Sequence, residues 1–237
     1  LSAVPHHFIA SHSIHQPVNA ADFEKYALDK IADIFKRAEH AVMVGGTGLY
    51  IKAFCEGLDK IPPVPKEIHE QVNKDFESNG LVWLQSEIER LDPTFFATGE
   101  TENPHRLLRA LEVILATGTS IRTFQSGAKA DRQFDIIKLG IAPPKEILHA
   151  QINQRVDAMI TAGQIEEARA LHQYKDLVPL QTVGYSELFE YFEGKINQKE
   201  AIELIKVRTR QYAKRQLTWF RKDNMRWFES GAELSIN

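Results

Sequence analysis

The stretch Ala41-Val42-Met43-Val44-Gly45-Gly46-Thr47-Gly48 decides the expected fold. Its first half is a short apolar run, and its second half is rich in glycine. A run of this length that ends in glycines is typical of a strand buried in a parallel sheet. An amphipathic helix is expected before it over residues 19–37, and another helix begins at about residue 49. The order helix, strand, glycine turn, helix predicts an α/β core.

A proline-rich segment, Ile61-Pro62-Pro63-Val64-Pro65, marks a boundary after this part, because proline interrupts helices and sheets alike. The residues that follow have helical patterns. The clearest pattern has Asn103 as N-cap, Pro104 at the first helical position and Gly118 just past its end. The helices expected here cover residues 66–78, 81–91 and 104–116.

Residues 134–141 become apolar and stop at Pro143-Pro144, so we expect a second core strand there. The rest of the chain is expected to be helical, over residues 145–162, 165–174, 185–192 and 198–222. The simplest organisation is an α/β core made of residues 1–60 and 132–237. A helical insertion over residues 61–131 interrupts it.

The composition is ordinary for a globular domain, with 43% hydrophobic and 26% charged residues among 237. No apolar run approaches the roughly 20 residues that span a bilayer, and the single Cys55 fits a reducing compartment. The first residues, Leu1-Ser2-Ala3-Val4-Pro5, contain no initiator methionine and resemble no signal peptide. We therefore expect a fragment of a longer protein.

The net charge of −3 argues against a nucleic-acid binder, but the charge is unevenly distributed. Residues 206–222 contain seven Lys or Arg residues and no Asp or Glu, interleaved with Tyr212, Trp219 and Phe220. Arginine pairs with phosphate, and flat rings stack on unpaired bases. The same pattern also suits a helix with an apolar face in the core and a solvated basic back. The absence of acids favours an RNA-facing surface.

The glycine stretch has two interpretations. Glycines between a strand and a helix let an anion approach the backbone and the helix N-terminus, or they simply make a tight turn. The stretch is not a Walker A loop, because no Gly-Lys-Ser or Gly-Lys-Thr follows it. The N-terminal histidines fit no common zinc spacing, so no metal site is predicted among them: His6, His7, His12 and His15.

Arg106 and Arg109 lie three residues apart, so they project from one side of an expected helix near its start. Cations there oppose the helix dipole, which suggests an anionic partner. The alternatives are ordinary solvated arginines or ion pairs with Glu102 or Glu112. Helical geometry alone favours these alternatives.

Together these pieces resemble the tRNA dimethylallyltransferase family over nearly the whole chain. Four motifs in the right order carry the resemblance: Val44-Gly45-Gly46-Thr47-Gly48-Leu49-Tyr50, Asp92-Pro93 with Arg106-Leu107-Leu108-Arg109-Ala110-Leu111-Glu112-Val113, Val183-Gly184-Tyr185, and Thr209-Arg210-Gln211-Tyr212-Ala213-Lys214-Arg215-Gln216-Leu217-Thr218-Trp219-Phe220-Arg221. The resemblance implies a P-loop NTPase-like parallel-sheet core, here incomplete at its N-terminus, with a helical insertion that contacts tRNA. It implies transfer of a dimethylallyl group from dimethylallyl diphosphate to N6 of the adenosine adjacent to the anticodon, with Mg²⁺ accompanying the diphosphate. It also implies a cytoplasmic monomer that binds the tRNA anticodon stem-loop.

The resemblance carries over to individual positions of this sequence. Thr47 matches a catalytic threonine at the substrate channel, and Gly45, Gly46 and Gly48 lie on its diphosphate side. Residues matching segments that contact tRNA are His105, Arg106, Leu107, Leu108, Arg109, Gln181, Thr182, Val183, Gly184, Tyr185, Ser186, Lys214, Arg215, Gln216, Leu217, Thr218, Trp219, Phe220 and Arg221. At His69 some members of the family have an arginine that contacts tRNA.

One departure from the family pattern is large. The family's P-loop and the Asp that acts as general base do not occur among these residues. Electrostatic stabilisation of a leaving group is worth roughly 3 kcal/mol per donor, so we expect little activity from this polypeptide alone. Three alternatives remain: an adenylate isopentenyltransferase acting on free nucleotide, a non-catalytic RNA-binding module, and a small-molecule P-loop kinase.

Overall fold

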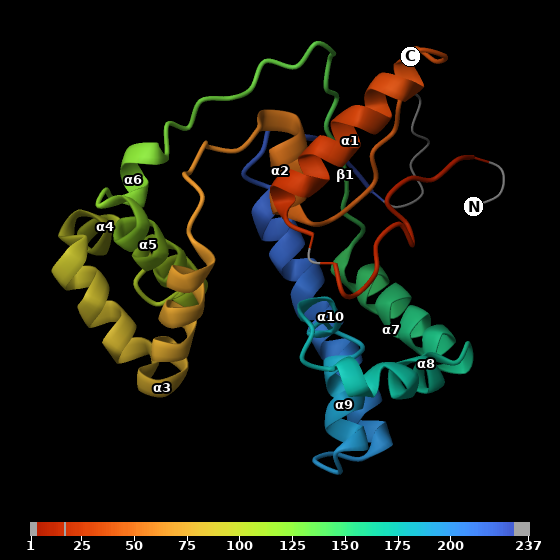
Figure 1. Ribbon diagram of the computed structural model, residues 1–237. Helices are drawn as coiled ribbons and strands as arrows, with labels where there is room; N and C mark the ends of the chain where they lie inside the picture. Colours follow the sequence, from red (N-terminus) through yellow and green to blue (C-terminus); the bar gives the residue numbers. More distant parts are fainter. Residues whose placement is uncertain (1–3, 17, 230–237) are drawn as a thin grey trace. The chain divides into compact units, whose positions relative to one another are not determined.

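The chain divides into two units, each with its own core. The structure, a computed structural model, describes residues 4–16 and 18–229 (Figure 1). One unit contains the residues up to Cys55 and those from Arg132 onward, and the other is Glu56–Asp131. The sequence-based boundary at residue 61 lies inside the second unit, and the boundary at 131 falls at its end.

The first helix, α1 (Ala20–Phe35), begins where the sequence predicts it. Asn19 Oδ1 accepts the N–H of Asp22 at 3.0 Å, and Asp22 Oδ2 accepts the N–H of Asn19 at 3.1 Å. This reciprocal cap satisfies donors that a helix end otherwise leaves without partners. The prediction of this helix from its cap and its apolar spacing is confirmed.

The apolar run before the glycines does not form the strand that we expected. No residue from 41 to 47 is in a strand, and the side chains of Val42 and Val44 are 82% and 91% exposed. The prediction of a buried strand there is wrong for this structure. A strand needs a neighbouring strand for its backbone hydrogen bonds. An apolar run indicates a tendency to be buried, but it does not show which strand would pair with it. The helix after the run, α2 (Gly48–Glu56), is present as predicted.

Within the described residues the sheet has two parallel strands, β1 (Leu139–Ile141) and β2 (Arg226–Phe228). Gly140 pairs with Trp227, and a Cβ atom on Gly140 would lie 2.5 Å from the Trp227 ring. The glycine therefore lets the indole cross the strand. The expected strand at 134–141 shrinks to its last three residues, and β2 was not predicted. The α/β class with parallel pairing is confirmed.

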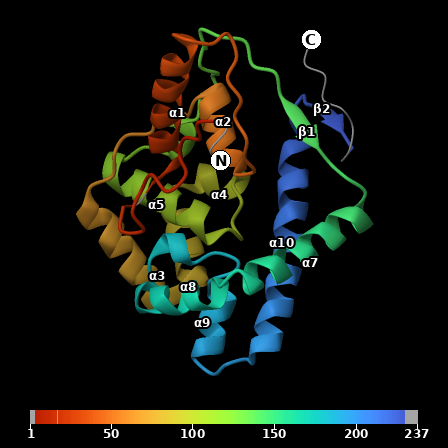
Figure 2. The ribbon, with the colours of Figure 1, turned by 90° about the vertical axis from the view of Figure 1, so that its right-hand side faces the viewer.

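The other helices of the first unit follow the predicted order. They are α7 (Lys145–Thr161), α8 (Gln164–Leu171), the short turns η1 (His172–Tyr174) and η2 (Val178–Leu180), α9 (Ser186–Phe192) and α10 (Gln198–Phe220). Figure 2 shows the long α10 crossing α7 and running beside α9. Their shared core contains Val156, Ala168, Leu188, Phe189 and Ile205. This packing fixes which faces of α10 remain open.

The second unit is helical throughout its regular elements. They are α3 (Lys66–Leu91), α4 (Pro93–Thr98), α5 (Pro104–Thr117) and α6 (Ile121–Phe124). Gly80 has φ +72° and kinks α3, so the two helices predicted there form one bent element. α5 has the predicted Asn103 cap, Pro104 start and Gly118 stop, the last at φ +67°. Neither α4 nor α6 was predicted.

No helix in the described part of the chain combines the length and the apolarity needed to cross a bilayer.

Candidate functional site

The glycine loop, residues 45–48, lies against the C-terminal half of α10. The side-chain amide of Gln216 donates to the carbonyl oxygen of Gly46 at 3.0 Å. A Cβ atom on Gly46 would lie 1.9 Å from Gln216 Nε2, and one on Gly48 would lie 2.4 Å from Trp219 Nε1. A side chain at position 48 would therefore clash with the Trp219 ring, and one at position 46 would displace the end of the Gln216 side chain. A Cβ atom on Gly45 would make an ordinary van der Waals contact, 3.8 Å from Ile51 Cδ1. The placement of Gly45, Gly46 and Gly48 on the diphosphate side of the channel stays a prediction.

Thr47 occupies the exposed tip of this loop. Its carbonyl oxygen accepts the backbone N–H groups of Tyr50 at 3.0 Å and Ile51 at 3.1 Å, which closes the first turn of α2. Among the described residues nothing hydrogen-bonds the Thr47 hydroxyl. Tyr50 in turn donates its hydroxyl proton to the carbonyl oxygen of Val18 at 2.8 Å. The loop therefore presents a free hydroxyl from a backbone held at both sides.

The basic residues of α10 divide into two sets. Those in the middle of the helix are engaged: Lys206 pairs with Asp157, Arg208 Nη1 lies 2.9 Å from Glu187 Oε1, and Arg210 Nη1 donates to Asn153 Oδ1 at 2.6 Å, whereas Lys199 near the helix start is exposed. Those nearer its C-terminus are exposed and form no ion pair within the described residues: Lys214, Arg215, Arg221 and Lys222. The engaged set contributes to packing between helices, and the RNA-facing interpretation stays a prediction for the exposed set.

The exposed half of α10 also carries aromatic and hydroxyl groups. The Arg215 guanidinium lies 5.5 Å from the centre of the Tyr212 ring, an arrangement that keeps the cation over a flat surface. Thr218 is exposed but donates its hydroxyl proton to the carbonyl oxygen of Lys214. Leu217 and Phe220 are half-buried, so they contribute mainly to packing. Gln216 and Trp219 contact the glycine loop, and a tRNA contact for them stays a prediction.

The loop at residues 181–186 is held by a carboxylate that sequence reasoning missed. Glu187 is fully buried; its Oε2 accepts the N–H of Gly184 at 2.8 Å, and its Oε1 binds Arg208. Gly184 has φ +103°, and a Cβ atom there would lie 2.7 Å from Gln164 Nε2. The spacing of Glu187 three residues after Gly184 at a helix start was the available signal.

Only part of this loop is open to a ligand. Gln181 and Thr182 are exposed, Val183, Tyr185 and Ser186 are half-buried, and Gly184 is buried. The Tyr185 hydroxyl donates to Glu167 Oε1 at 2.7 Å. Burial, together with this hydrogen bond, raises the pKa of Tyr185 to about 12. Its phenol therefore stays protonated at neutral pH.

In the second unit, the segment 105–109 is split between surface and core. His105 and Arg106 are exposed, and Arg106 Nη1 lies 2.6 Å from Glu100 Oε1. Leu107 and Leu108 belong to the core of the unit. Their side chains support the surface residues of the same helix, and a tRNA contact at these two positions stays a prediction.

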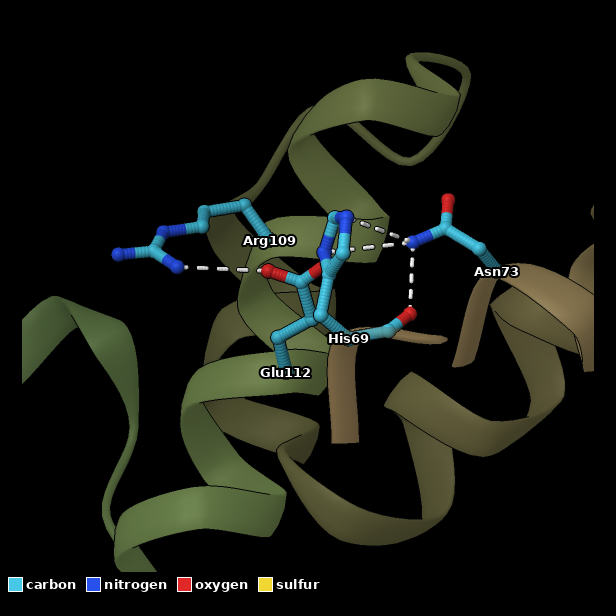
Figure 3. Close-up of polar contacts among 4 residues, drawn as sticks. All are labelled: His69, Asn73, Arg109 and Glu112. Carbon is cyan, nitrogen blue, oxygen red and sulfur yellow. Dashed lines mark hydrogen bonds and ion pairs between the residues drawn. The ribbon is translucent and has the colours of Figure 1, made fainter. Parts of the chain in front are cut away.

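A polar cluster joins α3 to α5 (Figure 3). Glu112 Oε1 lies 2.6 Å from His69 Nδ1, and its Oε2 lies 3.3 Å from Arg109 Nη1. Asn73 Nδ2 donates to the carbonyl oxygen of His69 at 2.7 Å. The ion pair between Arg109 and Glu112 was one of the alternatives open from the sequence, and it is confirmed.

The described residues contain no group of three or more His, Cys, Asp or Glu side chains arranged to hold a metal ion. Three of the four N-terminal histidines have other partners. His12 stacks at a tilt against Phe8, and His15 meets the Tyr174 ring edge-on. His6 Nδ1 lies 2.7 Å from the carbonyl oxygen of Val4.

The fold and this site define a class of protein. It is an α/β protein in which the glycine loop is fixed to a helix with exposed cations. In the part of the chain that the structure describes, the loop hydroxyl has no hydrogen-bond partner and these cations form no ion pair; this arrangement is suited to phosphate-bearing substrates. The particular family follows from comparison. Residues 1–223 match the family described as IPP transferase, and the chain belongs to that family. The resemblance carried by the four motifs is confirmed.

Relatives of known name agree with this assignment. The tRNA dimethylallyltransferase of Christiangramia forsetii is 48% identical over 230 residues, which is 97% of this chain and 76% of the relative. That of Cytophaga hutchinsonii is 42% identical over 234 residues, 98% of this chain and 77% of the relative. The solved tRNA isopentenylpyrophosphate transferase of Bacillus halodurans is 32% identical, with a TM-score of 0.64 covering 96% of this chain and 72% of that one.

Proposed function

We propose that the chain transfers a dimethylallyl group from dimethylallyl diphosphate to the N6 amine of the adenosine adjacent to the anticodon in tRNA. The amine nitrogen forms a bond to the terminal carbon of the dimethylallyl group. The bond from that carbon to the diphosphate oxygen breaks, pyrophosphate leaves with the electron pair, and the amine loses one proton. Family membership over residues 1–223 supports this reaction.

The observation that carries the proposal is the attachment of the Thr47 loop to α10. The hydrogen bond from Gln216 to Gly46 attaches the loop to α10. The same helix carries Lys214 and Arg215, which form no ion pair within the described residues. A polyanion bound along those cations would bring one of its bases to the Thr47 hydroxyl. The target base must leave its stack to reach a catalytic group, as is general for enzymes that modify bases.

Mg²⁺ enters this proposal with the diphosphate. The described residues offer no carboxylate and histidine cage, and Mg²⁺ commonly keeps several waters and binds substrate phosphates instead. When bound, it would neutralise charge on the leaving oxygens. A polypeptide limited to these 237 residues contains no Gly-Lys-Ser or Gly-Lys-Thr phosphate loop. We propose that such a polypeptide transfers little on its own while still binding RNA.

The proposal also covers the oligomeric state, the location and the RNA partner of the protein. It acts as a monomer in the cytoplasm, and Glu56–Asp131 forms the insertion that grips the anticodon stem-loop. The named relatives are tRNA dimethylallyltransferases, which supports tRNA as the partner. Size-exclusion chromatography with light scattering checks the monomer.

A binding comparison tests the proposed substrate class. The chain is titrated with a labelled anticodon stem-loop and, separately, with AMP. Binding of the stem-loop without binding of AMP supports the proposal, whereas preference for AMP indicates an adenylate isopentenyltransferase. Calorimetry with dimethylallyl diphosphate, using the protein purified from its native cell, distinguishes an enzyme from a non-catalytic RNA-binding module. The module would give no heat of binding.

A further inference from the structure

Glu112 is a buried carboxylate with exposed partners. Its side chain is 7% exposed, whereas those of His69 and Arg109 are 60% and 43% exposed. It lies in α5 between two core residues, Leu111 and Val113. Figure 3 shows its two oxygens occupied from either side, one by the imidazole and one by the guanidinium.

Stability alone does not explain a carboxylate at this place. Taking a charge out of water is costly, and well-packed apolar residues often replace a buried ion pair without loss. The surrounding α3 and α5 residues are apolar, among them Val72 and Leu108. A leucine or methionine at position 112 would suit this core, so the carboxylate indicates a task connected with the groups that it holds.

The groups that it holds keep free hydrogen-bonding capacity. A guanidinium has five N–H donors in a fixed fork, and the carboxylate accepts one N–H of Arg109. The imidazole uses Nδ1 toward Glu112, and Asn73 Nδ2 donates to the His69 carbonyl oxygen at 2.7 Å while lying 3.4 Å from the ring Nε2, so Asn73 restrains the ring as well as the backbone. Both side chains are thereby restrained while much of each stays exposed, 60% for His69 and 43% for Arg109, and Arg109 keeps most of its donors for a ligand.

We propose that Glu112 is a positioning residue that holds Arg109 and His69 side by side as a preformed grip on the RNA sugar–phosphate backbone. The inference rests on the proposed function, in which this unit contacts tRNA, and adds to it the carboxylate and His69. Restraining the two side chains before binding removes the entropy cost of ordering them in the complex. Arginine supplies the forked donor that matches a phosphate.

The direction in which Glu112→Gln changes the RNA affinity distinguishes a positioning role from an effect of net charge alone. Glu112→Gln raises the net charge of the chain by one unit, which by itself strengthens attraction to RNA. If the Glu112 carboxylate only connects α3 to α5, Glu112→Gln should therefore leave RNA binding unchanged or make it tighter. Loss of positioning gives weaker binding, by about tenfold if the preorganisation of one long side chain is lost.

The chain offers a matched control for this substitution. Glu87 forms an equivalent pair with Arg90, three residues further along α3, and Glu87→Gln changes the net charge equally. Binding of a labelled anticodon stem-loop is measured for the wild type, Glu112→Gln and Glu87→Gln. His69→Gln is added because its exposed side chain can change without disturbing the core, and melting curves check the fold of each variant.

The outcomes are distinct. Weaker binding by Glu112→Gln and His69→Gln, with Glu87→Gln at or above the wild-type affinity, supports the grip. If both neutralised variants bind alike and His69→Gln binds as the wild type does, the positioning role is overturned while the proposed function stands. If Glu112→Gln unfolds, His69→Gln alone decides between these two results. A wild-type chain that does not bind the stem-loop overturns the proposed function and the grip with it.

Discussion

At the scale of the residue, two of the three glycines of the loop and the glycine after η2 have close neighbours that account for them. Gly46 and Gly48 make room for Gln216 and Trp219, and Gly184 adopts φ +103° beside Gln164. The sequence marks such positions as glycines but cannot say what approaches them, because the approaching side chains lie far away along the chain. The predicted functional role of Thr47 rests on the family resemblance for the same reason.

Gly184→Ala should destabilise the first unit by about 1–3 kcal/mol, because the φ value is unfavourable for any residue with a Cβ atom and Gln164 must also move. Chemical denaturation measures the loss. Gly194→Ala is the matched control, since Gly194 has φ +73° and open space around it. Equal losses in the two variants would show that the contact with Gln164 contributes nothing.

Tyr185 gives a prediction about pH. Its pKa in the folded chain is raised to about 12, so the folded state favours the protonated phenol. The stabilisation is complete below the ordinary pKa of about 10 and is lost as the pH rises toward 12. Ultraviolet titration of the wild type against Tyr185→Phe should show one phenol that ionises late. Glu167→Gln should bring that ionisation to lower pH, and an unchanged titration would contradict the role of Glu167.

At the scale of the element, helices whose signals are local were predictable and strands were not. The helices α1 and α5 begin at Asn19 and Asn103 as expected, because a cap is read within four residues. The apolar run at 41–44 lacks a ladder partner in the structure, and β2 pairs with β1 from almost ninety residues further along the chain. Pairing of that kind leaves no local trace in the sequence.

Gln216→Ala should loosen the glycine loop from α10 without removing a charge. We expect a lower maximal rate of dimethylallyl transfer, by about fivefold if one neutral hydrogen bond is lost, with RNA affinity nearly unchanged. Gln211→Ala is the control, because Gln211 is an exposed residue of the same helix. A loss confined to RNA affinity would instead make Gln216 an RNA contact.

At the scale of the whole molecule, a net charge of −3 hides a concentrated cationic surface. The structure divides the basic stretch into residues 206–210, held by Asp157, Glu187 and Asn153, and residues 214–222, whose cations form no ion pair among the described residues. The seventeen-residue stretch without acids predicted such a surface but not its limits, since the neutralising carboxylates belong to α7 and α9. The second unit, by contrast, buries Leu107 and Leu108, which the motif match includes in a segment that contacts tRNA.

Arg215→Met should weaken binding of the anticodon stem-loop and lower the slope of log affinity against log salt by about one, as expected for the loss of one phosphate contact. Lys199→Met is the control, because it removes one exposed cation at the other end of α10. Equal effects of the two substitutions would mean that net charge, and not the free half of α10, governs binding.

The central claim, prenylation beside the anticodon, is tested most directly by locating the transferred group. Transfer RNA is incubated with dimethylallyl diphosphate, Mg²⁺ and the protein as it is made in its cell, then digested and mapped by mass spectrometry. We expect one dimethylallyl group on the adenine next to the anticodon, and none when that adenosine is replaced by guanosine. A group found on free AMP but not on tRNA, or on another position of the RNA, would contradict it.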